Sequence, residues 1–368
     1  MDSSLAAYHY LFATFAFVLG AVVGSFLNVC IYRMPLDLSV NKPRRSFCPV
    51  CKQQLKWHHN VPLLSWLFLR GRCANCGTPI PFRYFVVEFV TALLFLAAWL
   101  QFPGPIAVAY WVFISLLIVG IFIDVEHFII PDEVTIGGIV TGLIASFLVP
   151  ALMSSYGRWG ALLTSALSAL LGYVLLWIVL EAGKKAFGKK RIQLDAPTPF
   201  NWTRKGEDAD FVVGDEQSLW SDYFSREKDV LILCCDEAAV DGRDLGKVDL
   251  LFHYNRVNIV DGEEFSLDAL EKITGVVREL VIPREAMGRG DLKFLAAIGA
   301  FLGWRAVFFS VFAGSLLGSL MGLATLLIGR RVWSAKLPFG PYLAFGALVW
   351  MFFGQSLLSW YLGLLNPY

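Results

Sequence analysis

The stretch FVTALLFLAAWLQFPGPIAVAYWVFISLLIVGIFI occupies residues 89–123 and contains no charged side chain. About 20 apolar residues are enough to cross the hydrocarbon core of a bilayer. Pro103, Gly104 and Pro105 interrupt this stretch, and neither proline nor glycine favours the interior of a helix. The sequence here predicts two transmembrane helices that are joined by a tight turn.

The rest of the chain extends the same pattern. Of its 368 residues 57% are hydrophobic and only 17% are charged, and the mean hydropathy is +0.59. A soluble protein of this length carries more charge. Further apolar runs cover about residues 10–32, 134–153, 161–180, 292–304, 306–329 and 339–362. We therefore predict a polytopic all-α membrane protein with about eight transmembrane helices.

These runs divide the chain into five segments. We expect a first transmembrane helix in residues 1–32, a cytoplasmic loop in 33–83, helices two to five in 84–183, an inserted soluble domain in 184–287 and helices six to eight in 288–368. The insertion is the charged part, with fifteen Lys/Arg and twenty-one Asp/Glu in residues 184–286. Its short apolar runs at 230–233 and 248–252, with the turn signals Asp241-Gly242 and Asp261-Gly262, predict a small strand-rich domain.

The basic residues predict the orientation in the membrane. Residues 33–83 contain nine Lys/Arg and one acid, whereas the opposite loops contain only Arg158 and Arg305. The other basic residues expected on the same side of the membrane as residues 33–83 are Lys184, Lys185, Lys189, Lys190, Arg191, Arg330 and Arg331. The first basic residue is Arg33, so the first apolar run lacks a basic leader and is expected to remain as a span. We predict a multi-pass membrane protein whose basic loops face the cytoplasm.

Two aspartates lie at the ends of predicted spans on that cytoplasmic side. Asp124 ends the third run and Asp291 begins the sixth, within Gly288-Arg289-Gly290-Asp291. An ionisable residue at membrane depth is costly and is expected to serve a function. Two facing carboxyl groups can share one proton, so that one activates water and the other protonates a peptide carbonyl. The pair predicts an aspartic protease, in which the two glycines let the backbone approach closely.

Other readings of these acids remain open. An aspartate at the end of a membrane helix is often only an interfacial cap. Glu126, Asp132 and Glu133 compete with Asp124 for the catalytic role, while His127 and Lys293 are candidates to tune the pair or to lie at the membrane surface. Glu88 could pair with Arg83 or extend to the membrane interface, and in either case it is expected to be structural rather than catalytic.

Four cysteines form two Cys-x-x-Cys pairs in the first cytoplasmic loop. The pairs are Cys48 with Cys51 and Cys73 with Cys76, and twenty-one residues separate them. Two such turns provide four thiolates for a tetrahedral zinc ion, and disulfides are disfavoured in a reducing cytoplasm. Four thiolates complete the coordination sphere, so the zinc is predicted to be structural. His58 and His59 are expected to lie outside the sphere, and Cys30, Cys234 and Cys235 are expected to pack in apolar cores.

The motifs together resemble the bacterial type IV prepilin peptidases, which are GxGD membrane aspartic proteases. The likeness rests on residues 24–29, 31–33 and Pro35, on the two cysteine pairs, and on Arg83-Tyr84 and Glu88. It continues through residues 124–132, 288–293, 337–341 and 344–346. The resemblance implies that Asp124 and Asp291 are the catalytic pair. It also implies a location in the bacterial inner membrane. This chain departs from the family at residues 184–287, since many members have only a short loop there.

The resemblance also implies what the enzyme acts on. Its substrates are expected to be type IV prepilins and the pseudopilins of type II secretion, each cut on the cytoplasmic side just before its hydrophobic helix. It further implies N-methylation of the new N-terminus with S-adenosylmethionine, although no methyl-donor signature and no cofactor-binding residues stand out in the sequence. The chain shows no nucleic-acid patch, so prepilins and the lipid bilayer are the expected partners.

Two other functions stay open at this point. One is a presenilin-like protease that cuts within a lipid-embedded helix, although the cysteine loop and the extended motifs argue against it. The other is a non-catalytic scaffold whose cysteine module docks assembly proteins. An Asp→Asn substitution at position 124 or 291 separates the scaffold from the proteases, because a scaffold would keep its function.

Overall fold

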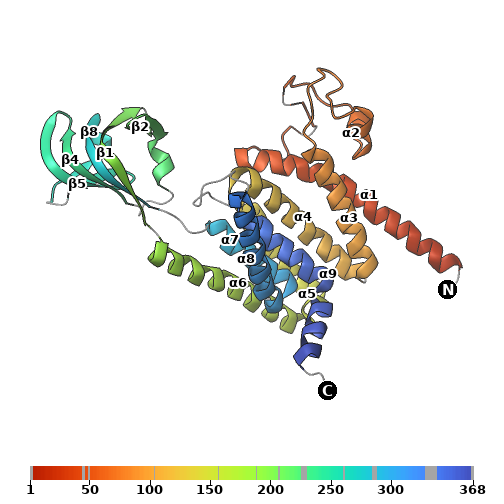
Figure 1. Cartoon of the computed structure of the whole chain (residues 1–368). Helices are drawn as coiled ribbons and strands as arrows, with labels where there is room; N and C mark the ends of the chain where they lie inside the picture. The colour runs from red at the N-terminus through yellow and green to blue at the C-terminus, as the bar shows by residue number, and fades with distance from the viewer. Residues whose placement is uncertain are drawn as a thin grey trace. The chain divides into compact units, whose positions relative to one another are not determined.

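The computed structural model describes residues 3–43, 46–48, 50–102, 104–155, 157–187, 189–205, 208–224, 230–259, 262–283, 288–327 and 338–365. The predictions that involve Pro49, Pro103, Asp261, Arg330, Arg331 and Leu337 therefore lie outside the described residues. The chain forms two compact units (Figure 1). One consists of Met1–Trp177 with Gly288–Tyr368 and is helical, and the other is Ile178–Met287.

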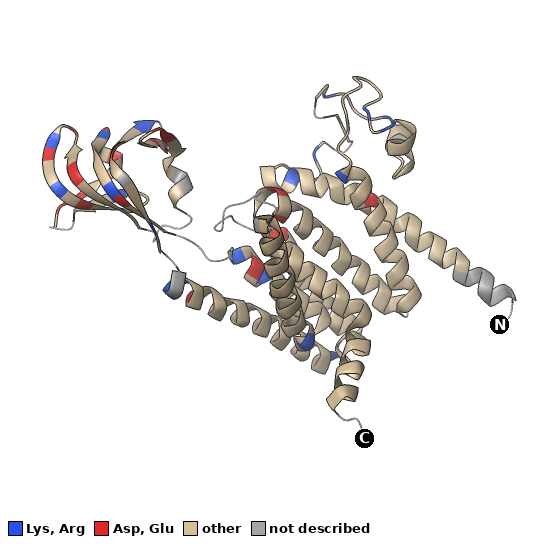
Figure 2. Cartoon of the chain, in the orientation of Figure 1, with Lys and Arg blue, Asp and Glu red and all other residues tan. Residues whose placement is uncertain are grey.

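The described residues form nine α-helices. They are α1 (Ser3–Arg33), α2 (Leu64–Phe68), α3 (Arg83–Gln101), α4 (Gly104–His127), α5 (Asp132–Leu148), α6 (Arg158–Phe187), α7 (Arg289–Leu302), α8 (Trp304–Leu327) and α9 (Gly340–Leu365). The predicted break in residues 89–123 is confirmed, because α3 ends at Gln101 and α4 begins at Gly104. Figure 2 shows that the long helices are almost free of charge, whereas charged side chains gather on the strands.

Six of the described helices are long and apolar enough to cross a membrane: α1, α3, α4, α6, α8 and α9. The other two predicted spans form helices, but α5 has 17 residues and α7 has only 14. At 1.5 Å per residue these helices are about 26 Å and about 21 Å long, shorter than a hydrocarbon core of about 30 Å. The chain is an integral membrane protein, and its eight-span topology stays a prediction.

The short helix α7 is enclosed by other helices. Ten of its 14 residues are buried, and it packs against α5, α8 and α9. Small residues permit this close packing. A Cβ atom on Gly299 would lie 2.4 Å from the Ser168 carbonyl oxygen of α6, and the Ser165 hydroxyl of α6 donates a hydrogen bond of 2.7 Å to the Ala300 carbonyl. Neighbouring helices thus take the place that lipid takes around a full span.

The second unit is built on one antiparallel sheet of eight strands. They are β1 (Lys189–Lys205), β2 (Asp208–Val213), β3 (Glu216–Leu219), β4 (Leu231–Val240), β5 (Arg243–Phe252), β6 (Arg256–Ile259), β7 (Glu264–Ser266) and β8 (Lys272–Pro283), in the order β3-β2-β1-β8-β4-β5-β6-β7. The predicted turn at Asp241-Gly242 joins β4 to β5, and both residues have the positive φ of a tight hairpin. The predicted strand-rich domain is confirmed.

The core of this unit explains why its strands form. Alternate side chains of β4, including Leu231, Leu233 and Cys235, are buried against Phe211 and Phe252. The period of two is that of a strand with one covered face. Burial raises the pKa of the Cys235 thiol to about 12, so this cysteine is an unreactive core residue, as expected. Cys30 is likewise buried, within α1.

Candidate functional site

Asp124 lies near the end of α4 and is buried, with only 5% of its surface exposed. Its Oδ2 atom accepts a hydrogen bond of 2.9 Å from the backbone N–H of Gly340, the first residue of α9. The partial positive charge at a helix N-terminus favours an anion there. Pro341 suits the start of α9, because proline lacks an N–H that the first turn cannot use. The contact therefore stabilises the ionised form of Asp124.

Gly340 allows this contact because it has no side chain. A Cβ atom at position 340 would lie 2.7 Å from Asp124 Oδ2 and 2.9 Å from Ile130 Cδ1, closer than nonbonded atoms approach. Our sequence reasoning counted Gly340 as part of a motif but gave it no role. The signal that could have indicated one is a Gly-Pro pair at the start of a helix.

Asp291 lies in the first turn of α7 and is 7% exposed. Its Oδ1 atom is buried and has no hydrogen-bond partner among the described residues. Asp124 lies close enough to interact electrostatically with Asp291. The structure thus brings together the two aspartates that the sequence singled out, although 167 positions separate them in the chain, from 124 to 291.

Aromatic packing holds α7 against α4. The Phe294 ring of α7 lies over Gly120 of α4, where a Cβ atom would be 2.9 Å from the ring. The rings of Phe113 and Phe301 have centroids 4.8 Å apart. Burial of large aromatic side chains contributes strongly to such contacts. Both phenylalanines of α7 point toward α4 and fix the depth at which Asp291 meets Asp124.

Close packing explains why the second residue of the Gly-x-Gly-Asp motif that precedes Asp291 is a glycine. A Cβ atom at Gly290 would lie 3.2 Å from Ile130 Cβ and 3.3 Å from its carbonyl oxygen, which is tighter than usual contact. Ile130 belongs to the short connection between α4 and α5, where Phe128 has a φ of 57°. At Gly288 the nearest atom would be Asp291 Oδ2 at 3.6 Å, which is ordinary contact. The expected close approach therefore occurs at Gly290.

Most of the competing acids have other partners. Asp132 forms an ion pair of 2.6 Å with Lys293, and Glu126 forms one with Arg83. Of the two alternatives for Glu88, the ion pair with Arg83 does not form, and Glu88 Oε2 instead accepts a hydrogen bond of 2.7 Å from the Leu63 N–H. Glu133 and His127 are exposed at the ends of α5 and α4. Among the candidate acids near the ends of α4 and α5, only Asp124 is buried.

The four predicted metal ligands also converge. The Sγ atoms of Cys48, Cys51, Cys73 and Cys76 all lie within 4.8 Å of one another. A zinc tetrahedron with bonds of about 2.3 Å has its sulfur atoms about 3.8 Å apart. The Sγ atoms of Cys48 and Cys76 are 3.8 Å apart. The cluster can hold a metal ion without a histidine ligand.

The two cysteine turns share one backbone geometry. The N–H of Lys52 donates to the Cys48 carbonyl at 2.8 Å, and the N–H of Gly77 donates to the Cys73 carbonyl at 2.9 Å. Both donors have positive φ, which glycine adopts without strain. The Cys76 thiol donates a hydrogen bond of 3.3 Å to the Thr78 hydroxyl oxygen. The matching turns thus present both cysteine pairs to one point.

Comparison with protein families places both regions in known domains. The model of the "Bacterial Peptidase A24 N-terminal domain" matches residues 18–102, which include the four cysteines. The model of the "Type IV leader peptidase family" matches residues 111–192 and 257–323, which include both aspartates. The gap between the two matched segments falls in the strand unit.

Curated relatives match all or part of the chain. A prepilin leader peptidase/N-methyltransferase of Aeromonas hydrophila is 27% identical over 377 residues, covering 96% of this chain and 94% of that protein. One of Klebsiella pneumoniae is 36% identical over 50% of this chain and 82% of its own length. One of Myxococcus xanthus is 50% identical over 37% of this chain and 41% of its own length. No solved structure matches. The chain belongs to the type IV leader peptidase family.

Proposed function

We propose that this protein is a membrane aspartic endopeptidase that removes the basic leader from type IV prepilins and type II pseudopilins. The single observation that carries the proposal is the buried pair of Asp124 and Asp291, each at the end of a helix and close enough to interact. The relatives are named prepilin leader peptidases, and this supports the substrate class.

The geometry supports different roles for the two aspartates. The Gly340 N–H stabilises a negative charge on Asp124, so Asp124 acts as the base that takes a proton from the attacking water. Asp291 Oδ1 has no partner among the described residues and is free to donate a proton to the carbonyl oxygen of the scissile peptide. Water then adds to the carbonyl carbon. As the C–N bond breaks, the leaving amine receives the proton that Asp124 took from the water, and the new carboxyl group returns a proton to Asp291.

We place this reaction at the cytoplasmic face of the bacterial inner membrane. The loop between α1 and α3 contains most of the nine Lys/Arg of residues 33–83, and basic loops remain in the cytoplasm. The charged strand unit follows α6, whose last turn contains Lys184 and Lys185. A substrate with a basic leader and a hydrophobic helix has its cleavage site at this interface.

The test is cleavage of a purified prepilin, followed by mass spectrometry of the leader. The full-length enzyme in detergent micelles should cut once, just before the hydrophobic segment. A double variant with both Asp124→Asn and Asp291→Asn serves as the control and should leave the prepilin intact. Cleavage by the double variant at the wild-type rate would refute the dyad, and cuts within the hydrophobic helix would indicate a presenilin-like protease.

We further propose that the four cysteines bind one structural zinc ion. Elemental analysis of the purified chain should find about one zinc per molecule. Replacing Cys48 and Cys73 together with serine should abolish zinc binding and lower the melting temperature, because thiolate ligation contributes to folding stability. Cys234→Ser, which changes a cysteine of β4 outside the cluster, is the matched control and should retain the zinc. Wild-type protein without zinc would contradict the proposal.

A second activity, N-methylation of the new N-terminus with S-adenosylmethionine, is proposed from the relatives' names. Each of the relatives named above is a prepilin leader peptidase/N-methyltransferase. This activity requires a site for the methyl donor in addition to the aspartate pair.

A further inference from the structure

The helices α3 and α4 form an antiparallel hairpin, and Asp124 lies near its open end. The two helices pack against each other, and the chain joins them at their other end, between Gln101 and Gly104. Asp124 comes 20 residues after Gly104, which is about 30 Å along α4 at 1.5 Å per residue. The chain connection alone therefore does not fix the last turn of α4.

An ion pair closes the open end of this hairpin. Arg83, the first residue of α3, pairs with Glu126 in the last turn of α4. The side chain of Arg83 is only 18% exposed, and its guanidinium lies over the Tyr84 ring, 5.4 Å from the ring centroid. A pair that is partly shielded from water is screened less by salt than a fully exposed one. The pair is thus a specific contact between the start of α3 and the end of α4.

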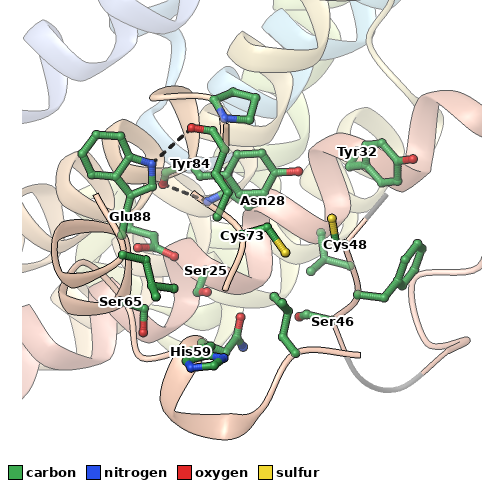
Figure 3. A pocket seen from close by; sticks show the side chains of 18 of the residues that line it. Ser25, Asn28, Tyr32, Ser46, Cys48, His59, Ser65, Cys73, Tyr84 and Glu88 are labelled. Carbon is green, nitrogen blue, oxygen red and sulfur yellow. Dashed lines mark hydrogen bonds between the residues drawn. The ribbon is translucent and has the colours of Figure 1, made fainter. Parts of the chain in front are cut away.

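The start of α3 is itself anchored to α1. Asn28 Nδ2 of α1 donates a hydrogen bond of 3.0 Å to the Tyr84 carbonyl oxygen, which Figure 3 shows where both residues line a pocket. The two helices also approach closely one turn later, since a Cβ atom on Gly24 of α1 would lie only 2.7 Å from the Cα atom of Glu88. Arg83 therefore extends toward α4 from a helix start that is held in place.

Glu126 and Asp124 lie on opposite sides of the last turn of α4, because two residues along a helix correspond to a rotation of about 200°. On one side α3 holds Glu126 through the ion pair. On the other side Asp124 Oδ2 accepts the hydrogen bond of 2.9 Å from the Gly340 N–H of α9. The helix ends at His127, and the last turn of a helix tends to fray because its carbonyl groups lack partners within the helix. Contacts on both sides keep this turn closed.

We propose that Arg83 is a positioning residue of the peptidase reaction, which acts through Glu126 to keep Asp124 in place. The inference rests on the proposed function and assigns a further residue to it. Arg83 lies in the segment that matches the N-terminal domain model, residues 18–102, whereas Glu126 lies in the peptidase segment 111–192. The N-terminal domain thereby contributes to the order of the catalytic pair, although neither aspartate belongs to it.

The test measures kcat and KM for prepilin cleavage by the full chain in detergent micelles. Arg83→Met removes the charge and should lower kcat about ten-fold, because small displacements of a catalytic group have large effects on rate, while KM changes less than about two-fold. Arg83→Lys keeps the charge, so its kcat should stay within about three-fold of wild type. Arg256→Met removes an arginine that pairs with Glu264 in the strand unit, and this matched control should cleave like wild type.

Two combinations of substitutions show how Arg83 acts. Glu126→Gln should lower kcat to a similar extent as Arg83→Met, and the two together should lower it no further, because both remove the same ion pair. Gly340→Ala already displaces Asp124 through its added Cβ atom. In that background Arg83→Met should lower kcat less than about three-fold, whereas two independent effects would multiply in full.

Cleavage by Arg83→Met at the wild-type rate would overturn the inference, and so would a loss confined to KM, which would indicate direct contact with the substrate. Full multiplication with Gly340→Ala would also overturn it, because Arg83 would then act independently of Asp124. If melting curves show that Arg83→Met does not fold, Glu126→Gln decides alone, since glutamine keeps the shape of glutamate: a fall in kcat supports the inference and an unchanged kcat overturns it. Wild type that cleaves no prepilin would refute the peptidase proposal instead.

Discussion

Asp291→Asn is expected to reduce prepilin cleavage at least about a thousandfold, because general acid–base catalysis by a positioned group contributes up to about 10⁴ in rate. Asparagine has nearly the same shape as aspartate but cannot supply a proton to the carbonyl oxygen. Asp291 Oδ1 has no partner among the described residues, so the substitution breaks no hydrogen bond of that atom. The rate should therefore fall without loss of the fold, as measured by single-turnover cleavage and mass spectrometry.

Asp124→Asn should have an effect of the same order for a different reason. Its side-chain oxygen can still accept from the Gly340 N–H, but the base that activates water is lost. Asp132→Asn is the matched control. It removes an exposed acid that forms an ion pair with Lys293 and does not belong to the catalytic dyad. A loss in the control as large as in the two dyad variants would show that total charge at this face, rather than the pair, determines the rate.

Gly340→Ala is expected to lower cleavage about a hundredfold, since a displacement of about 1 Å at a catalytic group can have an effect of that size. The added Cβ would lie 2.7 Å from Asp124 Oδ2 and must push that carboxylate or the start of α9 aside. The backbone N–H is retained, so only the position of the carboxylate changes. Cleavage rate and melting temperature should be measured together, with the rate affected far more than the stability.

Gly137→Ala provides the control for Gly340→Ala. Gly137 lies within α5, and a Cβ there would meet no atom within 4 Å. Alanine favours helix more than glycine does by about 1 kcal/mol, so this variant should be as active as wild type and slightly more stable. If Gly340→Ala matched it in rate, the tight contact at Asp124 would have no catalytic importance.

The helices could be predicted well from the sequence because lipid imposes a simple rule on it. Uncharged runs must be long enough to satisfy the backbone within a helix, and Pro-Gly-Pro marks the break between α3 and α4. The helices α5 and α7 were harder, since their apolar residues contact protein as well as lipid. Apolar composition alone does not distinguish a span from a short helix enclosed by others, as Gly299 against Ser168 illustrates.

The parts of the candidate site that could be predicted from the sequence are those where the residue type itself indicates the chemistry. The aspartates and cysteines stood out because an acid at membrane depth and a Cys-x-x-Cys pair are rare in other roles. Tertiary contacts decided the rest. Glu88 accepts from the backbone of Leu63, which sequence proximity to Arg83 does not reveal. Gly340 is 216 positions from Asp124, and only the packing of α9 on α4 brings them into contact.

The sheet pairing of the strand unit has a consequence for how such a protein can change. The first strand β1 and the last strand β8 are neighbours, with Lys189 opposite Pro283. Directly opposed residues of antiparallel strands lie about 5 Å apart. The points where the chain enters and leaves this sheet therefore nearly coincide, and a few residues can bridge them. A single deletion or insertion in the gene can thus remove or add the whole sheet, while a short loop still connects α6 to α7.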